Sequence, residues 1–303
     1  MKSFIRRLFK KRGPLSPKRI HRELNGRSAH GKHIITSADK GVFENMKVYY
    51  INRDNYENTP VIYLHGGAYL HGLNSLHFLF CKQLSKAIKS PITLLDYPLL
   101  PEENHELAYE KVLNYLNRFD DYILIGDSAG GGLALGCYLH QKLNNKHLPT
   151  KTVLLSPWID VTMTNPELAE FESLDFVLNT ETLIELGKRW ANPKETDHYL
   201  VSPINGPCSD LDNILLTSGT EELFTPDLRK LSNQLNKDNC KYIEGKKMFH
   251  DYALFINMGL KEADDTFKEI VDFLKHNKKW LIQKNKSLLI KHCHVQFDFY
   301  QRI

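Results

Sequence analysis

A serine, a histidine and a few acidic residues occupy positions where they could act together as nucleophile, base and orienting acid. Ser128 lies in the run Gly126-Asp127-Ser128-Ala129-Gly130, which has the pattern G-x-S-x-G. Residues 122–126 form an apolar run typical of a buried strand, and residues 133–143 have a helical pattern. A strand-to-helix corner pushes the serine out of the sheet, beside a helix N-terminus that favours negative charge. The motif predicts a nucleophile, while a glycine-rich turn with a capping serine is the plainer alternative.

Two consecutive glycines, Gly66 and Gly67, follow the apolar run at 61–64. A nucleophilic serine that attacks an acyl carbonyl creates an oxyanion, which needs backbone N–H donors already aimed at it. Ala129, directly after the serine, can supply one donor, and a loop without side chains can supply the others. We therefore expect Gly66, Gly67 and Ala129 to form an oxyanion hole, with a simple tight turn as the alternative for the glycines. His65 is expected to anchor this loop.

The base is expected to follow the serine in the chain. His250 lies in KMFHDYALF (247–255), just after an expected strand at 240–245. A loop at the end of that strand could bring the imidazole to the serine. His65, His71 and His77 precede the serine and fit this order badly. His250 is therefore the predicted base, and a surface histidine is the alternative.

The orienting acid is expected after the apolar run at 213–218. The segment TSGTEELFTPD (217–227) offers Glu221, Glu222 and Asp227. Asp227 follows Pro226 and is typical of a first-turn charge at the start of a helix. Glu222 is the better-placed candidate.

The elements that must position these residues alternate between apolar strands and amphipathic helices. This alternation predicts an α/β fold with a mostly parallel sheet covered on both faces. Residues 165–205 interrupt it with two helix-like pieces, at 167–172 and 180–190, and could form a lid over the carboxyl ends of the strands. The expected strands are 43–51, 61–64, 91–97, 122–126, 152–158, 213–220 and 240–245, and the expected helices are 75–89, 106–119, 133–143, 227–237 and 261–279.

Composition restricts the function classes. The 303 residues are 42% apolar and 25% charged, as in an ordinary soluble globular protein. The net charge is +4, but residues 1–32 hold eleven Lys and Arg against one acid, which leaves 29 basic and 35 acidic residues elsewhere. The body is therefore acidic, and a nucleic-acid partner is not expected. Five scattered cysteines without a C-x-x-C pair predict reduced thiols and a cytoplasmic location.

The two ends of the chain differ from the body. The N-terminal arm begins MKSFIRRLFKKR, with Phe4, Ile5, Leu8 and Phe9 at helical spacing between basic residues. Such an arm could pack on the domain, remain solvated, or rest peripherally on an anionic inner membrane surface. The tail at 281–303 contains His292-Cys293-His294, but adjacent residues do not easily share one ion, so no metal site is expected there.

Six segments, in matching order, resemble the hormone-sensitive-lipase-like family of α/β-hydrolases, in its bacterial esterase branch. HGGAY (65–69) resembles the oxyanion loop of the family, and GDSAGG (126–131) resembles its nucleophile elbow. GTEELFTPD (219–227) resembles the acid-bearing segment, which maps the acid onto Glu222. The remaining similar segments are DYPLLPE (96–102), LSPWID (155–160) and FHDY (249–252).

The resemblance implies an α/β-hydrolase fold without a cofactor. Its implied organisation is a basic arm that contributes to the cap (1–42), two halves of the hydrolase core (43–164 and 206–280), a cap insertion (165–205) and a tail (281–303). Two departures stand out: the usual acid is a glutamate here, and Leu99 replaces the usual arginine of the DYPLLPE-like segment.

The leading hypothesis is a serine carboxylesterase for small to medium acyl esters. Ser128 would attack, His250 would accept its proton, and Glu222 would orient His250. A non-catalytic small-ligand receptor on the same scaffold, or a lipase or peptidase, are the alternatives. The acyl length, the alcohol and the oligomeric state stay open at this stage.

Overall fold

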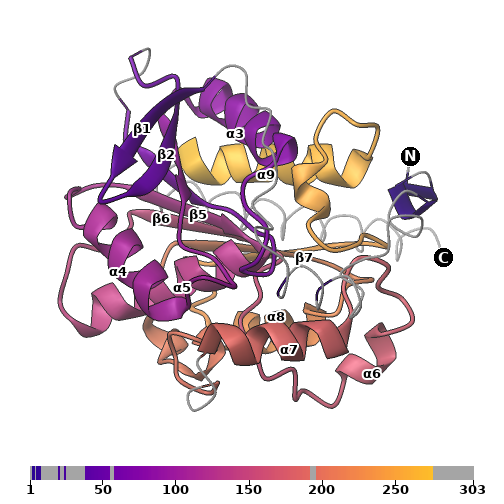
Figure 1. Ribbon diagram of the computed structural model, residues 1–303. Helices are drawn as coiled ribbons and strands as arrows, with labels where there is room; N and C mark the ends of the chain where they lie inside the picture. Colours follow the sequence, from indigo (N-terminus) through magenta and orange to yellow (C-terminus); the bar gives the residue numbers. More distant parts are fainter. Residues whose placement is uncertain are drawn as a thin grey trace, which may run out of the picture.

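The computed structural model describes residues 2–3, 5–7, 20, 24, 38–54, 58–191 and 196–275. Its strands are β1 (Asp39–Phe43), β2 (Met46–Ile51), β3 (Val61–Leu64), β4 (Ile92–Asp96), β5 (Ile123–Asp127), β6 (Lys151–Leu155), β7 (Ile214–Gly219) and β8 (Lys241–Gly245). They form one eight-stranded sheet in the order β1-β2-β4-β3-β5-β6-β7-β8 (Figure 1). β2 is antiparallel to β1 and β4, and the other neighbouring pairs are parallel. The predicted mostly parallel sheet is confirmed.

The start of the sheet differs from the prediction. Residues 43–51 were expected to form one strand, but the chain turns back at Glu44 and Asn45, whose φ angles are 45° and 67°. Positive φ at both central residues is typical of a two-residue hairpin turn. The strand before the turn, β1, is largely exposed and lacks the apolar run that reveals the other strands.

The helices lie in layers on both faces of the sheet (Figure 1). One apolar cluster joins α3 and α9 to one face, and a larger cluster joins α4, α5, α7 and α8 to the other. Alternate residues of a strand feed the two clusters: Val61 and Tyr63 lie in the first, Ile62 and Leu64 in the second. The helices are α3 (Ser75–Ile88), α4 (His105–Leu116), α5 (Ser128–Leu143), α6 (Leu168–Phe171), α7 (Thr180–Ala191), α8 (Thr225–Gln234) and α9 (Lys261–Lys275), with short 3-10 turns at Pro203–Asn205, Cys208–Asp210 and Tyr252–Leu254.

Helix α5 starts earlier than the sequence indicates. It was expected from residue 133, because the glycines before it have low helix propensity. The structure begins the helix at Ser128. A Cβ on Gly132 would lie 2.1 Å from the carbonyl oxygen of Trp158, so tertiary packing requires a residue without a side chain there.

Four parallel strands deliver the chemistry-bearing residues to one edge of the sheet. Gly66 and Gly67 follow β3, Ser128 follows β5, Glu222 follows β7 and His250 follows β8. Because neighbouring parallel strands end at the same edge, these loops lie together at the carboxyl ends of the strands.

The segment 165–205 contains α6 and α7, along the lower side of the molecule in Figure 1. Its expected helical pieces, 167–172 and 180–190, correspond to these two helices. Leu183, Leu186 and Trp190 of α7 are fully buried in the larger apolar cluster. Helix α7 is therefore packed firmly against the core.

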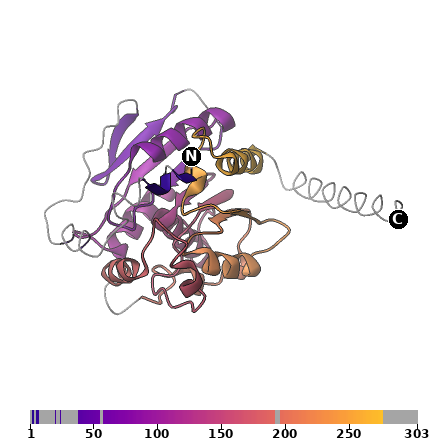
Figure 2. The same ribbon diagram turned by 90° about the vertical axis from the view of Figure 1, so that its right-hand side faces the viewer.

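A few N-terminal residues are described, and they lie against the body of the molecule beside the segment near residue 250 (Figures 1 and 2). Ile5 is buried in a small cluster with Phe176 and Phe249. The Lys2 ammonium lies 2.8 Å from a carboxylate oxygen of Glu221. Among the described residues, no helix is long and apolar enough to cross a membrane. The arm residues Phe4, Leu8 and Phe9 and the tail 281–303, with His292, Cys293 and His294, lie outside the described residues.

Candidate active site

Ser128 occupies a sharp corner between β5 and α5. Its φ angle is 49°, a left-handed conformation that residues with a side chain rarely adopt. The glycines around it are required by close backbone approach: a Cβ on Gly126 would lie 2.3 Å from the Gly130 carbonyl oxygen, and a Cβ on Gly130 would lie 2.2 Å from that of Leu64. The corner thus holds the serine in a strained conformation at the start of a helix, as a nucleophile elbow does.

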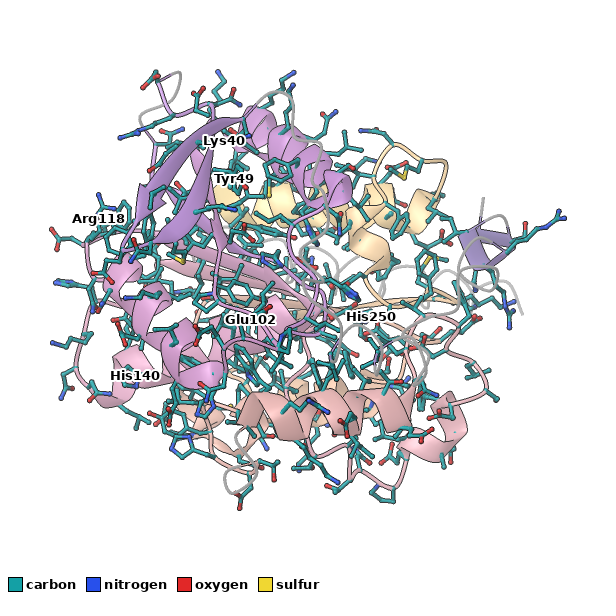
Figure 3. The ribbon with its side chains drawn as sticks, viewed as in Figure 1. Lys40, Tyr49, Glu102, Arg118, His140 and His250 are labelled. Atoms are coloured by element: carbon teal, nitrogen blue, oxygen red, sulfur yellow. The ribbon has the colours of Figure 1, made fainter. Side chains whose placement is uncertain are left out.

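His250 meets the serine directly. Its Nε2 atom lies 2.9 Å from Ser128 Oγ, and both side chains are buried. The two residues are 122 positions apart in the chain. Figure 3 labels His250 near the middle of the view, and its side chain is only 4% exposed. This distance allows proton transfer from the hydroxyl to the imidazole.

Glu222 faces the other nitrogen of the same ring. Its Oε2 atom lies 3.6 Å from His250 Nδ1, slightly beyond hydrogen-bonding distance. Catalytic hydrogen bonds are often long before substrate binds. Burial raises the pKa of Glu222, although the contacts with His250 and Ser156 oppose that effect. The geometry suits an orienting carboxylate.

The other two acid candidates have different partners. Glu221 pairs with Lys2 at the surface of the loop. Asp227 accepts a hydrogen bond of 2.7 Å from the Asn165 side chain, in the first turn of α8. Burial raises the pKa of Asp227 to about 6. Of the three, only Glu222 lies beside His250.

Ser156 is part of the site, and the sequence assigned it no role. Its hydroxyl donates a hydrogen bond of 2.8 Å to Glu222 Oε2 and accepts one of 3.2 Å from the backbone N–H of Asp251. Ser156 therefore links the loop that carries the acid to the loop that carries His250. In the sequence, only the position of Ser156 in the LSPWID segment, after β6, could have pointed to this role.

The glycine loop lies against the nucleophile. A Cβ on Gly66 would lie 2.9 Å from Ser128 Cβ and 2.3 Å from Asp127 Oδ2, so no side chain fits there. Gly67 has a φ of 126°, and a Cβ there would lie 2.2 Å from the carbonyl oxygen of His71. Ala129 is the second residue of α5, and the first N–H groups of a helix have no partner within the helix. Of the three expected oxyanion donors, Gly66 thus lies against Ser128 and Ala129 follows it directly in the chain.

The carboxylate of Asp127, the residue before Ser128, is buried and hydrogen-bonded. Asp127 accepts a hydrogen bond of 2.6 Å from the Tyr63 hydroxyl and lies 3.2 Å from His77 Nε2. His77 Nδ1 accepts the N–H of Asn74, so Nε2 carries the hydrogen and donates to Asp127. Burial alone would raise the pKa of Asp127, but the contacts with His77 and Tyr63 outweigh it and lower that pKa. Sequence order excluded His77 as the base, and its place here is structural.

His65 has the anchoring place that its position suggested. Its Nδ1 atom lies 2.7 Å from the carbonyl oxygen of Gly66, and its ring stacks on Tyr97 with centroids 4.5 Å apart. The Tyr97 hydroxyl donates a hydrogen bond of 2.6 Å to the backbone oxygen of His65. Burial and the neighbouring His77 lower the pKa of His65 to about 4, so its ring is neutral.

Aromatic rings connect helix α7, in the segment 165–205, to His250. Tyr69, after the glycine loop, stacks on Trp190 of α7 at 3.9 Å and on Trp158 at 5.5 Å. Trp158 stacks on Phe224, which meets the His250 ring edge-on at 5.1 Å. Tyr69 is therefore a core residue that fixes the site against the segment 165–205.

Two further carboxylates lie near His250 and were not anticipated. Asp175, from the segment between α6 and α7, accepts the backbone N–H of Leu223 at 2.8 Å and thereby holds the residue next to Glu222. Burial raises the pKa of Asp175. Asp251 has an oxygen 3.2 Å from His250 Nε2. Only its position after the base, in FHDY, could have pointed to it.

The part of the chain that the structure describes contains no group of three or more His, Cys, Asp or Glu side chains arranged to hold a metal ion. Of the described cysteines, Cys81, Cys137 and Cys208 are buried free thiols.

Known proteins with similar sequences or folds include esterases and an acetyl-hydrolase. A family model described as the alpha/beta hydrolase fold matches residues 61–254. An acetyl-hydrolase of Streptomyces hygroscopicus is 26% identical over 247 residues, 78% of this chain and 82% of the relative. An esterase of Acinetobacter venetianus is 24% identical over 223 residues, 70% of this chain and 73% of the relative. A crystal structure of an esterase from the bacterial hormone-sensitive lipase family is similar with a TM-score of 0.75 and 22% identity, covering 90% of this chain and 96% of that chain.

Proposed function

The chain belongs to the α/β-hydrolase fold family and is a carboxylic ester hydrolase, and on this premise we propose that it is a serine esterase with Ser128, His250 and Glu222 as its triad. The observation that carries the proposal is the 2.9 Å contact between His250 Nε2 and Ser128 Oγ at a strained strand-to-helix corner. A buried hydroxyl held by a buried imidazole in such a corner is arranged for nucleophilic attack.

The reaction runs through an acyl-enzyme. Ser128 Oγ attacks the ester carbonyl carbon while its proton passes to His250 Nε2, and the carbonyl oxygen becomes an oxyanion. As the tetrahedral intermediate collapses, the bond to the alcohol oxygen breaks and that oxygen takes the proton from Nε2. Water then attacks the acyl-enzyme with His250 as base, which releases the carboxylic acid and restores the Ser128 hydroxyl. Glu222 stabilises the imidazolium that forms in each half.

We assign the oxyanion donors to the backbone N–H groups of Gly66, Gly67 and Ala129. The contacts that exclude a side chain at Gly66 support this role, because the backbone there approaches the serine closely. Removing one such donor typically costs about 10²–10³ in turnover.

The proposed substrates are esters with small to medium acyl groups. The Streptomyces hygroscopicus relative is named an acetyl-hydrolase, which supports a short acyl group. Ser128 and His250 are buried, and Phe176 of the segment 165–205 packs on Phe249 beside His250, which favours a small substrate over a bulky one. A lipase or peptidase remains the second candidate, and a receptor role is disfavoured by the intact Ser128–His250 contact.

The test compares Ser128→Ala with the exposed control Ser209→Ala on p-nitrophenyl acetate, butyrate and octanoate. The first variant should lose hydrolysis while keeping its circular dichroism spectrum and melting temperature, and the control should retain both. A fluorophosphonate probe should label the parent and the control at one serine but leave Ser128→Ala unlabelled. Parent-like activity in folded Ser128→Ala would refute the proposal.

A further inference from the structure

His250 carries a carboxylate beside each of its ring nitrogens. Glu222 Oε2 lies 3.6 Å from Nδ1, and Asp251 Oδ2 lies 3.2 Å from Nε2. The usual triad explains the first contact only. The second places a negative charge on the nitrogen that must exchange a proton with Ser128 Oγ, 2.9 Å away. The base therefore sits between two acids.

The position of Asp251 is built into the loop. Its φ angle of 59° is a left-handed conformation, and its backbone N–H donates to Ser156 Oγ at 3.2 Å. The same Ser156 hydroxyl donates to Glu222. The Ser156 side chain thus links the Glu222 carboxylate to the backbone of Asp251. The Asp251 side chain is 17% exposed, so solvent screens its charge only weakly.

The charges that face His250 come from several elements. Glu222 comes from the loop after β7, Asp175 from the segment between α6 and α7, and Asp251 from the loop after β8 that also carries His250. The charge of Asp127, at the end of β5, also acts on Asp251, and Asp127 itself is held by Tyr63 and His77. The remaining neighbours are the Ser128 and Ser156 hydroxyls and the edge-on Phe224 ring. The surroundings are acidic on balance.

We propose that Asp251 is a positioning residue that holds the Nε2 edge of His250 and sets the proton affinity of this base. The inference rests on the proposed function, in which His250 accepts the Ser128 proton. In the resting enzyme, a lone pair on Nε2 facing a carboxylate is unfavourable, whereas an N–H there is favourable. The protonated form of His250 is therefore stabilised by a contact that a triad with one carboxylate lacks.

This arrangement affects the two proton transfers differently. It assists the first, since the imidazolium formed when Ser128 attacks has a carboxylate on each side. It opposes the second, since Asp251 competes with the leaving alcohol for the Nε2 proton. Burial lowers the pKa of His250, but Asp251 and then Glu222 outweigh it and raise that pKa well above its usual value. Burial also raises the pKa of Asp251, to about 6.

The consequence is a shifted pH dependence. Hydrolysis needs neutral His250, so a raised proton affinity moves the acid limb of kcat/KM toward higher pH. Asp251→Asn removes the charge and keeps the shape, and asparagine tolerates the left-handed conformation. We expect its acid limb to move to lower pH by about 1 to 3 units, the usual effect of a nearby opposite charge.

The experiment measures kcat/KM for p-nitrophenyl acetate from pH 5 to pH 9. It compares the parent with Asp251→Asn, Asp251→Gly, which suits the positive φ angle, and Asp251→Glu. The exposed control Asp238→Asn loses the same charge elsewhere. The two neutral variants should shift the acid limb downward, Asp251→Glu should restore part of the parent midpoint, and the control should leave it unchanged. A folded Asp251→Asn with the parent midpoint would overturn the inference, even if its turnover fell at every pH.

A second measurement separates this inference from the proposed function. The imidazole of His250 is titrated by NMR in Ser128→Ala and in the double variant Ser128→Ala/Asp251→Asn, neither of which needs to turn over. The inference requires a lower His250 pKa in the double variant, and equal values would refute it whatever the kinetics show. Persistent activity in Ser128→Ala would instead refute the triad and leave this titration valid.

Discussion

Replacing Ser156 with alanine tests whether the hydroxyl between the two loops supports the base. The hydroxyl donates to Glu222 at 2.8 Å and accepts from Asp251 N–H at 3.2 Å. A hydrogen bond to a charged group contributes about 1.5–3 kcal/mol. If that energy holds Glu222 in place during the reaction, its full loss lowers the rate by about 10- to 150-fold, since 1.36 kcal/mol is a factor of ten. Without the donor, the pKa of Glu222 should also rise further.

The assay is kcat and KM for p-nitrophenyl butyrate at pH 8, with thermal unfolding measured in parallel. We expect kcat to fall within that range while KM changes little, because the substrate does not bind Ser156. The free energy of unfolding should fall by about 1–3 kcal/mol, the cost of leaving a buried polar group unpaired. Ser209→Ala, at an exposed position, serves as the control. A Ser156→Ala enzyme with kcat within about twofold of the parent would refute the reasoning.

Three other predictions follow from the same geometry. Glu222→Gln should lower kcat by about 10⁴, as a misoriented histidine does in a comparable triad, whereas Asp227→Asn should leave kcat nearly unchanged; the reverse ranking in steady-state assays would move the acid to Asp227. Burial raises the pKa of Asp227 to about 6. Ionising this carboxyl in the folded state is therefore unfavourable, and the free energy of unfolding falls as pH rises from about 4 to 6. Asp227→Asn should therefore raise the free energy of unfolding by up to about 3 kcal/mol at pH 8 and by little at pH 4, and equal gains at both pH values would contradict this. Gly66→Ala places a Cβ 2.3 Å from Asp127 Oδ2, so kcat should fall by about 10²–10³ with little change in KM, and near-parent kcat would exclude Gly66 from the oxyanion hole.

The N-terminal arm gives a final prediction. Ile5 packs on Phe176 and Phe249, and Lys2 pairs with Glu221, one residue before the acid. These contacts support an arm that mainly packs as part of the cap. Deleting residues 1–19 should then change the acyl chain-length preference in detergent-free buffer. If the deletion variant has unchanged kinetics but no longer binds anionic vesicles, the arm is instead a membrane tether.

The family and the outline of the fold could be predicted because their signals are local. Six segments resembled the hormone-sensitive-lipase-like family, and the family match over residues 61–254 confirms an α/β-hydrolase. The buried parallel strands were visible as apolar runs, since both faces of the sheet are covered. The edge hairpin was missed, because β1 is largely exposed and lacks an apolar run.

The residue types and their order along the chain were determined by the sequence alone. The elbow at Ser128 follows from small residues between a strand and a helix, and that pattern needs no distant partner. The loops of Gly66, Glu222 and His250 were each expected after a parallel strand, and the common edge follows from the direction of those strands.

Only the tertiary structure decided which side chains meet at that edge. The resemblance maps the acid onto Glu222, but only the structure shows that Glu221 pairs with Lys2 while Glu222 faces His250. Ser156 and Asp251 join the site through contacts between residues 66 and 95 positions apart. Such distances depend on how strands pair and loops turn, and above all on a left-handed residue after the base. No local pattern specifies them, because they arise from packing between separate elements.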